Sequence, residues 1–539
     1  MAGEVRSAAE RRRKGGDVNE DARANAAGAQ RTGVRVSAAE APAVTASAPG
    51  PAAAPTGFPL AETFSEQFAF LAGHCGERAA VIASDGTLTF AELDARTTRA
   101  ARLFEQRGVA HGDFVLISTP HCALMVEASI AALKLGAIPM PVSDRLTQAE
   151  LDGLIALASP VLAVDTTARE VSTPRLRSLD EADSLPADAL PAVVGPSLKA
   201  PTSGGSTGTP KIIVSTAPGA PEGYCLLGAA MRVPAEGVCL VTAALYHNAS
   251  FSNALAALVQ GSTAVLMDRF DAEEALRLIE ARRATWIYMV PTMMLRVWKL
   301  PPEVRTGFDL SSLETVLHLA APCPAWLKRE WIDWLGPDVV YEVFGTTEGQ
   351  AATAISGRDW LERPGSVGRV ISGELVIRDE TGAEAAPGTV GEVWVRRGAE
   401  EPVPYRYLGA EAEVDAAGWE TVGDMGWKDE DGFVFLSDRR SDMILVGGVN
   451  VYPAEVEAAA EAHPQVLSAG CVGLDDEELG KRPALVVQTA SGEVPPDLED
   501  RLAEALARVK RPVRVLAATE PLRDAAGKVR RRALLARFA

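Results

Sequence analysis

The sequence is poor in the residues that cross-link chains and bind transition metals. It has six cysteines and six histidines among 539 residues. The cysteines lie far apart, with no C-x-x-C pair and no His/Cys cluster at zinc spacing. The plain expectation is a reduced, cytoplasmic protein without a disulfide framework or a structural metal.

The chain also lacks a long apolar run and an excess of positive charge. No unbroken apolar stretch is long enough to span a bilayer, and no signal-peptide core is present. The formal net charge of −19 argues against nucleic acid or an anionic membrane as the main partner. We expect a soluble protein that holds small anionic ligands with local positive groups.

Apolar residues, in contrast, are plentiful. They make up 47% of a chain that is too long for one compact domain. Residues 1–57 are rich in Ala, Arg, Gly, Ser and Pro and are expected to form a disordered tail. A large N-terminal domain is expected over residues 58–440 and a small C-terminal domain over residues 441–539, with the boundary in the polar run 437–442.

The pattern of apolar residues predicts an α/β fold. Thr89-x-x-Glu92 is a capping box at the start of an amphipathic helix. Strands are expected at 114–117, 138–142, 238–241, 263–266, 286–291 and 315–319, which implies a sheet covered by helices. From Gly373 the pattern becomes rich in β-hairpins, and a helix beginning at Pro453 opens a small α+β unit.

Residues 200–211 read Ala-Pro-Thr-Ser-Gly-Gly-Ser-Thr-Gly-Thr-Pro-Lys and are typical of a phosphate-binding loop. The glycines let backbone N–H groups converge on an anion, and Lys211 adds a full positive charge. A Walker loop and a hydrolase nucleophile elbow both need a helix next, whereas the β-branched run 212–214 predicts a strand. A Gly/Ser surface linker is the remaining alternative.

The loop resembles the nucleotide-binding loop of the adenylate-forming (acyl-activating) superfamily. The residues that carry this resemblance are Thr202, Ser203, Gly204, Gly205, Ser206, Thr207, Gly208 and Lys211. Other motifs of that family follow in order as far as the C-terminus. The resemblance implies a large adenylating domain with αβαβα layers and a β-barrel-like segment, a small mobile α+β C-terminal domain, and the cofactors ATP, Mg²⁺ and coenzyme A.

Residues 341–348 resemble the aromatic-Gly-x-Thr-Glu motif of the family. The resemblance assigns Thr347 to the α-phosphate, Glu348 to Mg²⁺ and Phe344 to the adenine. Gly345 belongs to the same motif and is also expected to bind the nucleotide. Phe344 stands where a tyrosine is usual. Three more residues, which a simple strand-end turn also explains, occupy the place of the adenine-contacting loop: Ala320, Ala321 and Pro322.

Residues 419–424 resemble the Thr-Gly-Asp motif, with Val422 in place of the usual threonine. By this resemblance Asp424 accepts hydrogen bonds from the ribose hydroxyls, and Arg439 is a second ribose contact. Without the other motifs, the two residues would be read as a surface ion pair that contributes little.

The C-terminal motifs complete the resemblance. Lys528, in the stretch 521–528, takes the place of the catalytic lysine that bridges the acid and the α-phosphate, although Asp524 stands where threonine is usual. Ser441 occupies the hinge position about which the small domain swings. Gly447 and Gly448 resemble the glycine pair that lets the pantetheine arm of coenzyme A pass close to the backbone.

The acid pocket is expected along residues 246–253, where the resemblance selects Tyr246, His247, Asn248 and Ser252. Amino-acid-activating relatives carry an aspartate near Asn248, so the neutral amide disfavours an α-amino acid. Small neighbouring side chains leave room for a bulky acid. The Tyr-His-Asn string is similar to acyl-CoA ligases of the bile-acid and steroid-acid type, and aryl and fatty acids stay open.

The resemblance implies ATP-dependent activation of a carboxylic acid, bulky, cyclic or aryl, as acyl-AMP, followed by transfer to the thiol of coenzyme A. The alternative is a stand-alone adenylation enzyme that loads a carrier protein, or one that activates another nucleophile such as nitrite for diazotisation. The sequence does not decide the acid, the acceptor or the oligomeric state.

Overall fold

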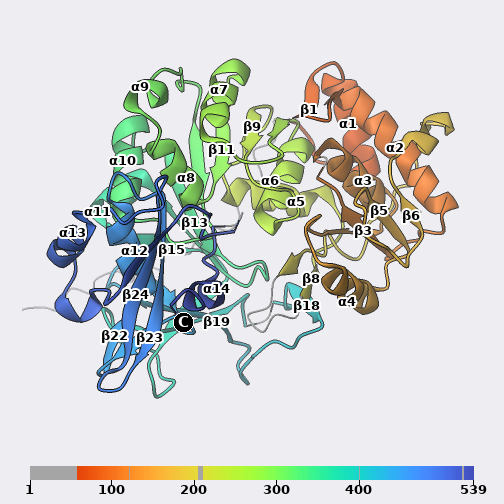
Figure 1. Ribbon diagram of the computed structural model, residues 1–539. Helices are drawn as coiled ribbons and strands as arrows, with labels where there is room; N and C mark the ends of the chain where they lie inside the picture. The colour runs from red at the N-terminus through yellow and green to blue at the C-terminus, as the bar shows by residue number, and fades with distance from the viewer. Residues whose placement is uncertain (1–57, 121, 204–210, 400, 525–526, 539) are drawn as a thin grey trace, which may run out of the picture. The chain divides into compact units, whose positions relative to one another are not determined.

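The computed structural model describes residues 58–120, 122–203, 211–399, 401–524 and 527–538 (Figure 1). The predicted tail at residues 1–57 lies outside the described residues. So do the five central residues of the predicted phosphate loop: Gly204, Gly205, Ser206, Thr207 and Gly208.

The first part of the described chain combines packed helices with a small parallel sheet. β3 pairs in parallel with both β4 and β5, and β5 pairs with β6. The elements are α1 Phe64–Cys75, α2 Phe90–Gln106, β3 Phe114–Ser118, α3 Cys122–Lys134, β4 Ile138–Pro141, α4 Gln148–Ala158, β5 Leu162–Asp165, β6 Arg175–Leu176 and a short 3-10 helix at Asp180–Ser184. α2 packs against both α1 and α3.

A long mixed sheet forms the centre of the large N-terminal α/β domain. Six strands run parallel in the order β1-β10-β9-β11-β12-β13, and β2 adds an antiparallel edge. The strands are β1 Ala79–Ala83, β2 Gly86–Thr89, β9 Val238–Val241, β10 Thr263–Leu266, β11 Trp286–Met289, β12 Thr315–His318 and β13 Val340–Gly345. The continuous buried runs of β10, β11 and β12 are typical of strands covered on both faces.

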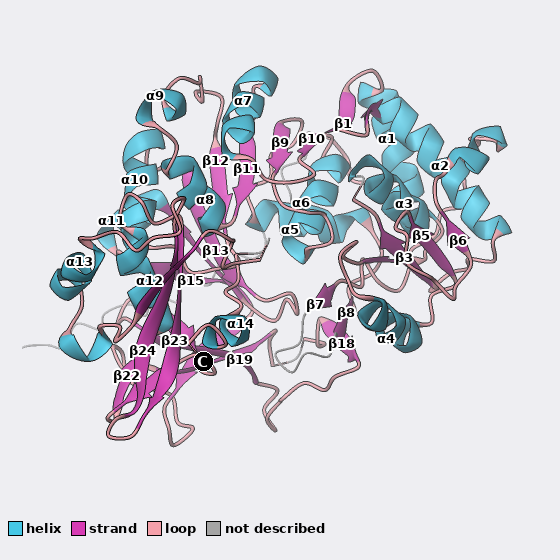
Figure 2. Ribbon diagram, viewed as in Figure 1, coloured by secondary structure: helices cyan, strands magenta, loops and turns pink. Residues whose placement is uncertain are grey.

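Helices accompany these strands along the chain, as Figure 2 shows. They are α5 Pro221–Ala230, α6 Asn248–Val259, α7 Ala272–Arg282, α8 Pro291–Trp298, α9 Pro302–Arg305 and α10 Ala325–Leu335. Most of their buried side chains belong to one large hydrophobic cluster shared with the sheet. The predicted α/β class is confirmed.

Beyond β13 the same sheet continues with antiparallel strands in the order β14-β15-β20-β19-β17-β16. The elements are β14 Ala352–Ser356, α11 Gly357–Glu362, β15 Ser366–Ser372, β16 Glu374–Arg378, β17 Gly391–Arg396, β19 Glu420–Lys428 and β20 Val434–Arg439. The expected hairpins are present. Among the described strands, β16 pairs with β17 and lies at the end of the order, with one further isolated bridge from Arg378 to Glu384, so this segment is an open antiparallel run and not a closed barrel.

A separate three-stranded sheet flanks the predicted phosphate loop. It contains β7 Thr202–Ser203, β8 Lys211–Ser215 and β18 Tyr405–Leu408. β8 pairs with both other strands, and Tyr407 lies opposite Ile213. The strand predicted directly after the loop is therefore present. A Walker loop or a hydrolase nucleophile elbow would have a helix at this place.

The small C-terminal domain has its own sheet and hydrophobic cores. Its elements are β21 Ile444–Val446, β22 Val449–Val451, α12 Pro453–Glu461, β23 Ser468–Asp476, β24 Gly480–Gln488, α13 Leu498–Ala505, a 3-10 helix at Arg508–Lys510, β25 Val515–Ala518 and α14 Arg531–Leu535. Two hydrophobic clusters use only residues from Ile444 onward.

Local sequence signals explain several of these boundaries. At α2, the Thr89 side chain accepts a hydrogen bond from the Glu92 backbone, and the Glu92 carboxylate accepts one from the Thr89 backbone, so the predicted capping box is confirmed. Pro453 is the first residue of α12, where its missing N–H costs nothing.

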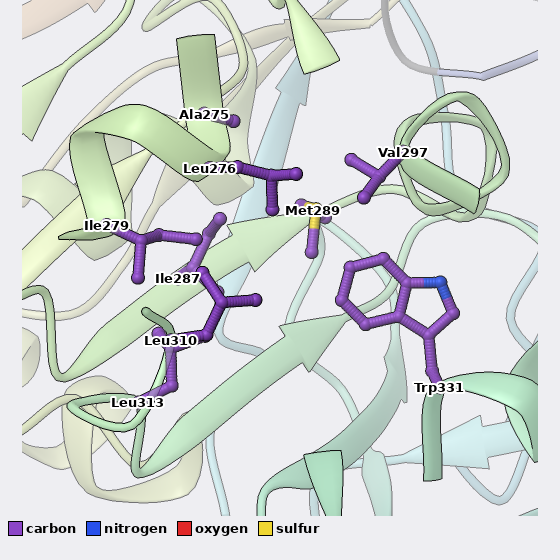
Figure 3. Close-up of a pocket in the computed structure, with 9 residues that line it drawn as sticks. All are labelled: Ala275, Leu276, Ile279, Ile287, Met289, Val297, Leu310, Leu313 and Trp331. Carbon is purple, nitrogen blue, oxygen red and sulfur yellow. The ribbon is translucent and has the colours of Figure 1, made fainter. Parts of the chain in front are cut away.

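Two hollows in the large domain lie away from the predicted site. Figure 3 shows the first, an apolar gap beside Trp331 that α7, β11, α8 and α10 line and that is too narrow for a water molecule. The second is an open cleft of about 500 Å³ near Asp85, Arg96, Glu127 and Arg177. No helix of the described residues has the length and apolarity needed to cross a bilayer.

Candidate active site

The loops that follow the parallel strands meet at one edge of the large sheet. Met289 of β11 lies opposite His318 of β12, which lies opposite Glu342 of β13. The segments after these strands, including 320–322 and 345–348, are therefore neighbours, as expected at the carboxyl ends of parallel strands. Ala320 has a φ of 77°, a left-handed conformation that is uncommon for alanine and is often found at binding sites.

Glu348 lies at the centre of a small polar cluster. The Tyr407 hydroxyl donates a hydrogen bond of 2.6 Å to Glu348 Oε1, and Lys211 Nζ lies 3.4 Å from the same oxygen. The Lys211 ammonium also lies 3.9 Å from the centre of the Tyr407 ring. The structure thus joins two predicted site residues, and it adds Tyr407, which sequence reasoning missed.

The surroundings of Glu348 favour its ionised form. Burial by itself would raise the pKa of this carboxyl. The Tyr407 hydroxyl, a backbone N–H and the Lys211 ammonium outweigh that effect and lower the pKa below its usual value. A half-buried carboxylate that stays ionised is a suitable oxygen ligand for Mg²⁺, which takes one or two carboxylates together with phosphate oxygens and water.

Asp424 and Arg439 face each other on adjacent strands. They are paired in the register of β19 and β20, and Arg439 Nε lies 3.0 Å from Asp424 Oδ1. Burial raises the pKa of Asp424, and the positive charges of Arg439 and Lys528 oppose that rise. The two residues predicted to contact ribose are therefore together, with the charge of Lys528 close by.

The charge of Lys528 acts on residues from both sides of the predicted site. Burial is the main cause of the lowered pKa of His247, the Asp524 carboxylate opposes it, and the ammonium of Lys528 lowers the pKa further. The same ammonium acts on Asp424. The Lys528 N–H donates to Asp524 Oδ1 over 2.9 Å. A Cβ added to Gly527 would lie 3.2 Å from Thr292 Oγ1, so Gly527 packs closely against the start of α8.

Contacts at the end of α12 join the small domain to the large one. Lys299 Nζ donates to the carbonyls of Glu461 and His463 over 3.0 and 2.8 Å. Trp326 Nε1 donates to the Ala458 carbonyl over 3.2 Å. Cations and donors near the carboxyl end of a helix satisfy its free carbonyls and its dipole. These contacts help to position the small domain that carries Lys528, and no local sequence signal indicated them.

The predicted acid pocket lies at the start of α6. The rings of Tyr246 and His247 are 4.4 Å apart, and His247 is the residue immediately before the helix. Ser252 Oγ donates to Asn248 Oδ1 over 3.4 Å, one turn along the helix. Ser252 Oγ also contacts the ammonium group of Lys199, a buried lysine that was not among the predicted residues. The sequence signal that could have indicated Lys199 is its charge, because every other residue of the stretch 196–203 is neutral.

The remaining predicted residues occupy ordinary structural positions. Phe344 packs against the hydrophobic cluster of the antiparallel strands. Thr346 and Thr347 are half-buried at the end of β13. Gly447 and Gly448 form the turn between β21 and β22 with φ values of 54° and 86°. Because glycine adopts positive φ values more easily than other residues, the turn alone explains the two glycines. Their contact with pantetheine stays a prediction, as does the hinge role of Ser441.

Tyr407→Phe is expected to move the acid limit of activity to higher pH. Because the hydroxyl lowers the pKa of Glu348, its loss raises that pKa, and the ionised form then disappears earlier as the pH falls. The cost of losing a hydrogen bond to a charged group is about 1.5 kcal/mol, or about tenfold in activity. Pyrophosphate release should be measured against pH and Mg²⁺ concentration.

Tyr405→Phe is the matched control. Tyr405 lies two residues earlier on β18, and its hydroxyl donates to Glu420 and not to Glu348. This variant should keep the acid limit of the parent. Equal shifts in both variants would contradict the assigned role of Tyr407.

Comparison with known proteins agrees with this arrangement. The family model described as AMP-binding enzyme matches residues 68–399, and the model described as AMP-binding enzyme C-terminal domain matches residues 455–528. The chain is 31% identical over 478 residues to 2-succinylbenzoate–CoA ligase of Geobacillus kaustophilus, covering 85% of this chain and 94% of the relative. It is 32% identical over 421 residues to feruloyl-CoA synthase of Amycolatopsis, covering 75% and 84% of the two chains.

Solved structures show the same architecture. The o-succinylbenzoate CoA synthetase of Bacillus subtilis, in complex with its acyl-adenylate intermediate, matches with a TM-score of 0.74 and 26% identity, covering 88% of this chain and 98% of that one. An amide bond synthetase of Marinactinospora thermotolerans matches with a TM-score of 0.74 and 25% identity, covering 88% and 100%. The family models cover well over half of the sequence, and this chain belongs to the AMP-binding enzyme family.

Proposed function

We propose that this enzyme activates a bulky, cyclic or aryl carboxylic acid with ATP and then transfers the acyl group to the thiol of coenzyme A. In the first step an oxygen of the acid attacks the α-phosphorus, and the bond to pyrophosphate breaks. In the second step the thiol sulfur attacks the acyl carbon, and the bond to AMP breaks. The observation that carries the proposal is the close packing of Gly527, next to Lys528, against the start of α8, with the charge of Lys528 acting on both His247 and Asp424.

The two neighbours of Lys528 belong to the two ends of the proposed acyl-adenylate. His247 lies at the start of α6, on the acid side, and Asp424 lies on β19, on the ribose side. A cation between them is suited to stabilise the charge that develops when two anions, the carboxylate and the α-phosphate, are brought together. The other residues mainly orient the reactants, as in phosphoryl transfer generally.

Glu348 is proposed to hold Mg²⁺, and Lys211 to contact the phosphates. Mg²⁺ bound there would reduce the negative charge on the phosphate oxygens of ATP. Lys211 supplies a second positive charge close to the Glu348 carboxylate, and Tyr407 fixes that carboxylate by its hydroxyl. The ionised state of Glu348 at neutral pH supports this role.

The relatives support an aryl or other bulky acid. One of them is named for 2-succinylbenzoate and another for a feruloyl product, and both of these compounds contain an aromatic ring. The neutral Asn248 and the small side chains along α6 agree with an acid that lacks an α-ammonium group. A bile acid or steroid acid stays a prediction from the sequence. Coenzyme A is the acceptor favoured by these names, and a carrier protein or another nucleophile is the alternative.

A panel of acids tests the proposal. Aryl, steroid, fatty and amino acids would each be mixed with enzyme and MgATP, and pyrophosphate would be measured with and without coenzyme A. We expect release with at least one aryl or cyclic acid, and the corresponding thioester when coenzyme A is present. Absence of release with every acid would contradict the adenylation step. Release without a thioester would identify a different acceptor.

A further inference from the structure

Lys199 is a buried lysine without an acidic partner among the described residues. Its side chain is 8% exposed, and its ammonium group contacts the Ser252 hydroxyl. Burial alone lowers its pKa to about 7, with no opposing contribution from a carboxylate. Lysine is rarely buried unless it is paired, because removing an ammonium ion from water is costly.

The backbone of Lys199 is held beside β8, and its side chain contacts α6. The Lys199 carbonyl accepts a hydrogen bond of 3.1 Å from the Ser215 N–H of β8, and the Lys199 N–H donates to Ser197 Oγ over 3.3 Å. The backbone is therefore fixed between a strand and the predicted acid pocket. Because the backbone is fixed and the ammonium group contacts the Ser252 hydroxyl, the positive group is held in place in advance.

Lys199 lies about one helical turn from the reactive end of the proposed acid pocket. Ser252, which it contacts, bonds to Asn248 four residues earlier on α6. One turn of helix spans about 5.4 Å. Asn248 directly follows His247, which is near Lys528. The path His247, Asn248, Ser252, Lys199 therefore leads away from Lys528 into the protein.

Polar groups along this path are neutral and partly unsatisfied. Among the described residues, His247 Nε2 and both side-chain atoms of Asn253 are buried without a hydrogen-bond partner. Ser252 and Asn248 supply a hydroxyl and an amide. A buried cation with neutral neighbours and spare donors is complementary to an anion, and the ligand that extends along this path is the acid itself.

We propose that Lys199 binds a second carboxylate of the acid substrate, at the end remote from the carboxyl group that is activated. This inference rests on the proposed function, and it narrows the substrate class to dicarboxylic acids. The ammonium and the second carboxylate form an ion pair shielded from water. An acid without that carboxylate leaves the cation buried and unpaired. A site with such an unpaired buried group discriminates most strongly against ligands that lack the matching group.

The experiment compares matched acids. α,ω-Dicarboxylic acids of increasing length and the three benzenedicarboxylates would each be tested against their monomethyl esters, which keep the size but remove one charge. With the parent enzyme, kcat/KM for pyrophosphate release is expected to be about 10- to 100-fold higher for the best diacid than for its ester. Lys199→Met should abolish this preference, and Lys199→Arg should restore part of it.

A stability measurement separates binding from a structural role. Lys199→Met replaces an unpaired buried cation by an apolar chain of similar size, so its Tm is expected to equal or exceed that of the parent. A lower Tm with an unchanged preference for diacids would overturn the inference. So would equal kcat/KM for diacids and esters in the parent, provided that other acids are activated. If no acid at all releases pyrophosphate, the proposed function itself has failed.

Discussion

Lys528→Ala is expected to reduce pyrophosphate release by about 100- to 1000-fold, the usual cost of removing one preorganised group that stabilises transition-state charge. The reason is that the charge of Lys528 acts on both His247 and Asp424. The side chain is exposed, so its removal should leave the Tm unchanged. Single-turnover formation of the acyl-adenylate is the direct measurement, with an acid chosen from the panel.

Arg530→Ala provides a matched control for Lys528→Ala. Arg530 lies two residues further along the chain, is also exposed, and carries the same charge. Its removal should change pyrophosphate release by less than about twofold, because a surface charge away from the reacting atoms contributes little. Equal losses in the two variants would indicate a general effect of charge and would contradict a specific role for Lys528.

Glu348→Gln is expected to lower pyrophosphate release by about 100-fold or more and to raise the Mg²⁺ concentration needed for half of the remaining activity. The amide keeps the shape of the side chain but loses the charge that attracts the cation. It also leaves the Lys211 ammonium, 3.4 Å away, without its carboxylate. Titration with Mg²⁺ and with Mn²⁺, at saturating ATP, measures the effect.

Glu348→Asp separates charge from geometry. It retains the carboxylate but shortens the side chain by one methylene. The carboxylate therefore moves away from the Tyr407 hydroxyl, which in the parent enzyme donates to Glu348 over 2.6 Å. We expect intermediate activity and a smaller change in the requirement for Mg²⁺. If Glu348→Gln titrates with Mg²⁺ as the parent does, Glu348 does not hold the metal, and the family resemblance has assigned the wrong residue.

Much of the fold was predictable because its signals are local. The Thr89 and Glu92 side chains lie three residues apart and cap α2 whatever the rest of the chain does. Pro453 begins α12, as predicted. The strand after the glycine loop was visible as a β-branched run, and this run excluded two competing motifs. The antiparallel segment was correctly predicted as hairpins, but its open edge depends on pairings far apart in the sequence.

The sequence by itself determined the α/β class, the order of the motifs and the types of residue available for chemistry. Tertiary structure decided which of them meet: Tyr407 reaches Glu348 across 59 residues, Lys211 reaches it across 137, and Lys199 contacts Ser252 across 53. Periodicity and capping act within a few residues, whereas these contacts depend on the pairing of distant strands and on the packing of α6. The same pairing determines which charges are buried and which groups face them. Burial lowers the pKa of Lys199, whereas the Tyr407 hydroxyl and the Lys211 ammonium lower the pKa of Glu348 against the effect of burial.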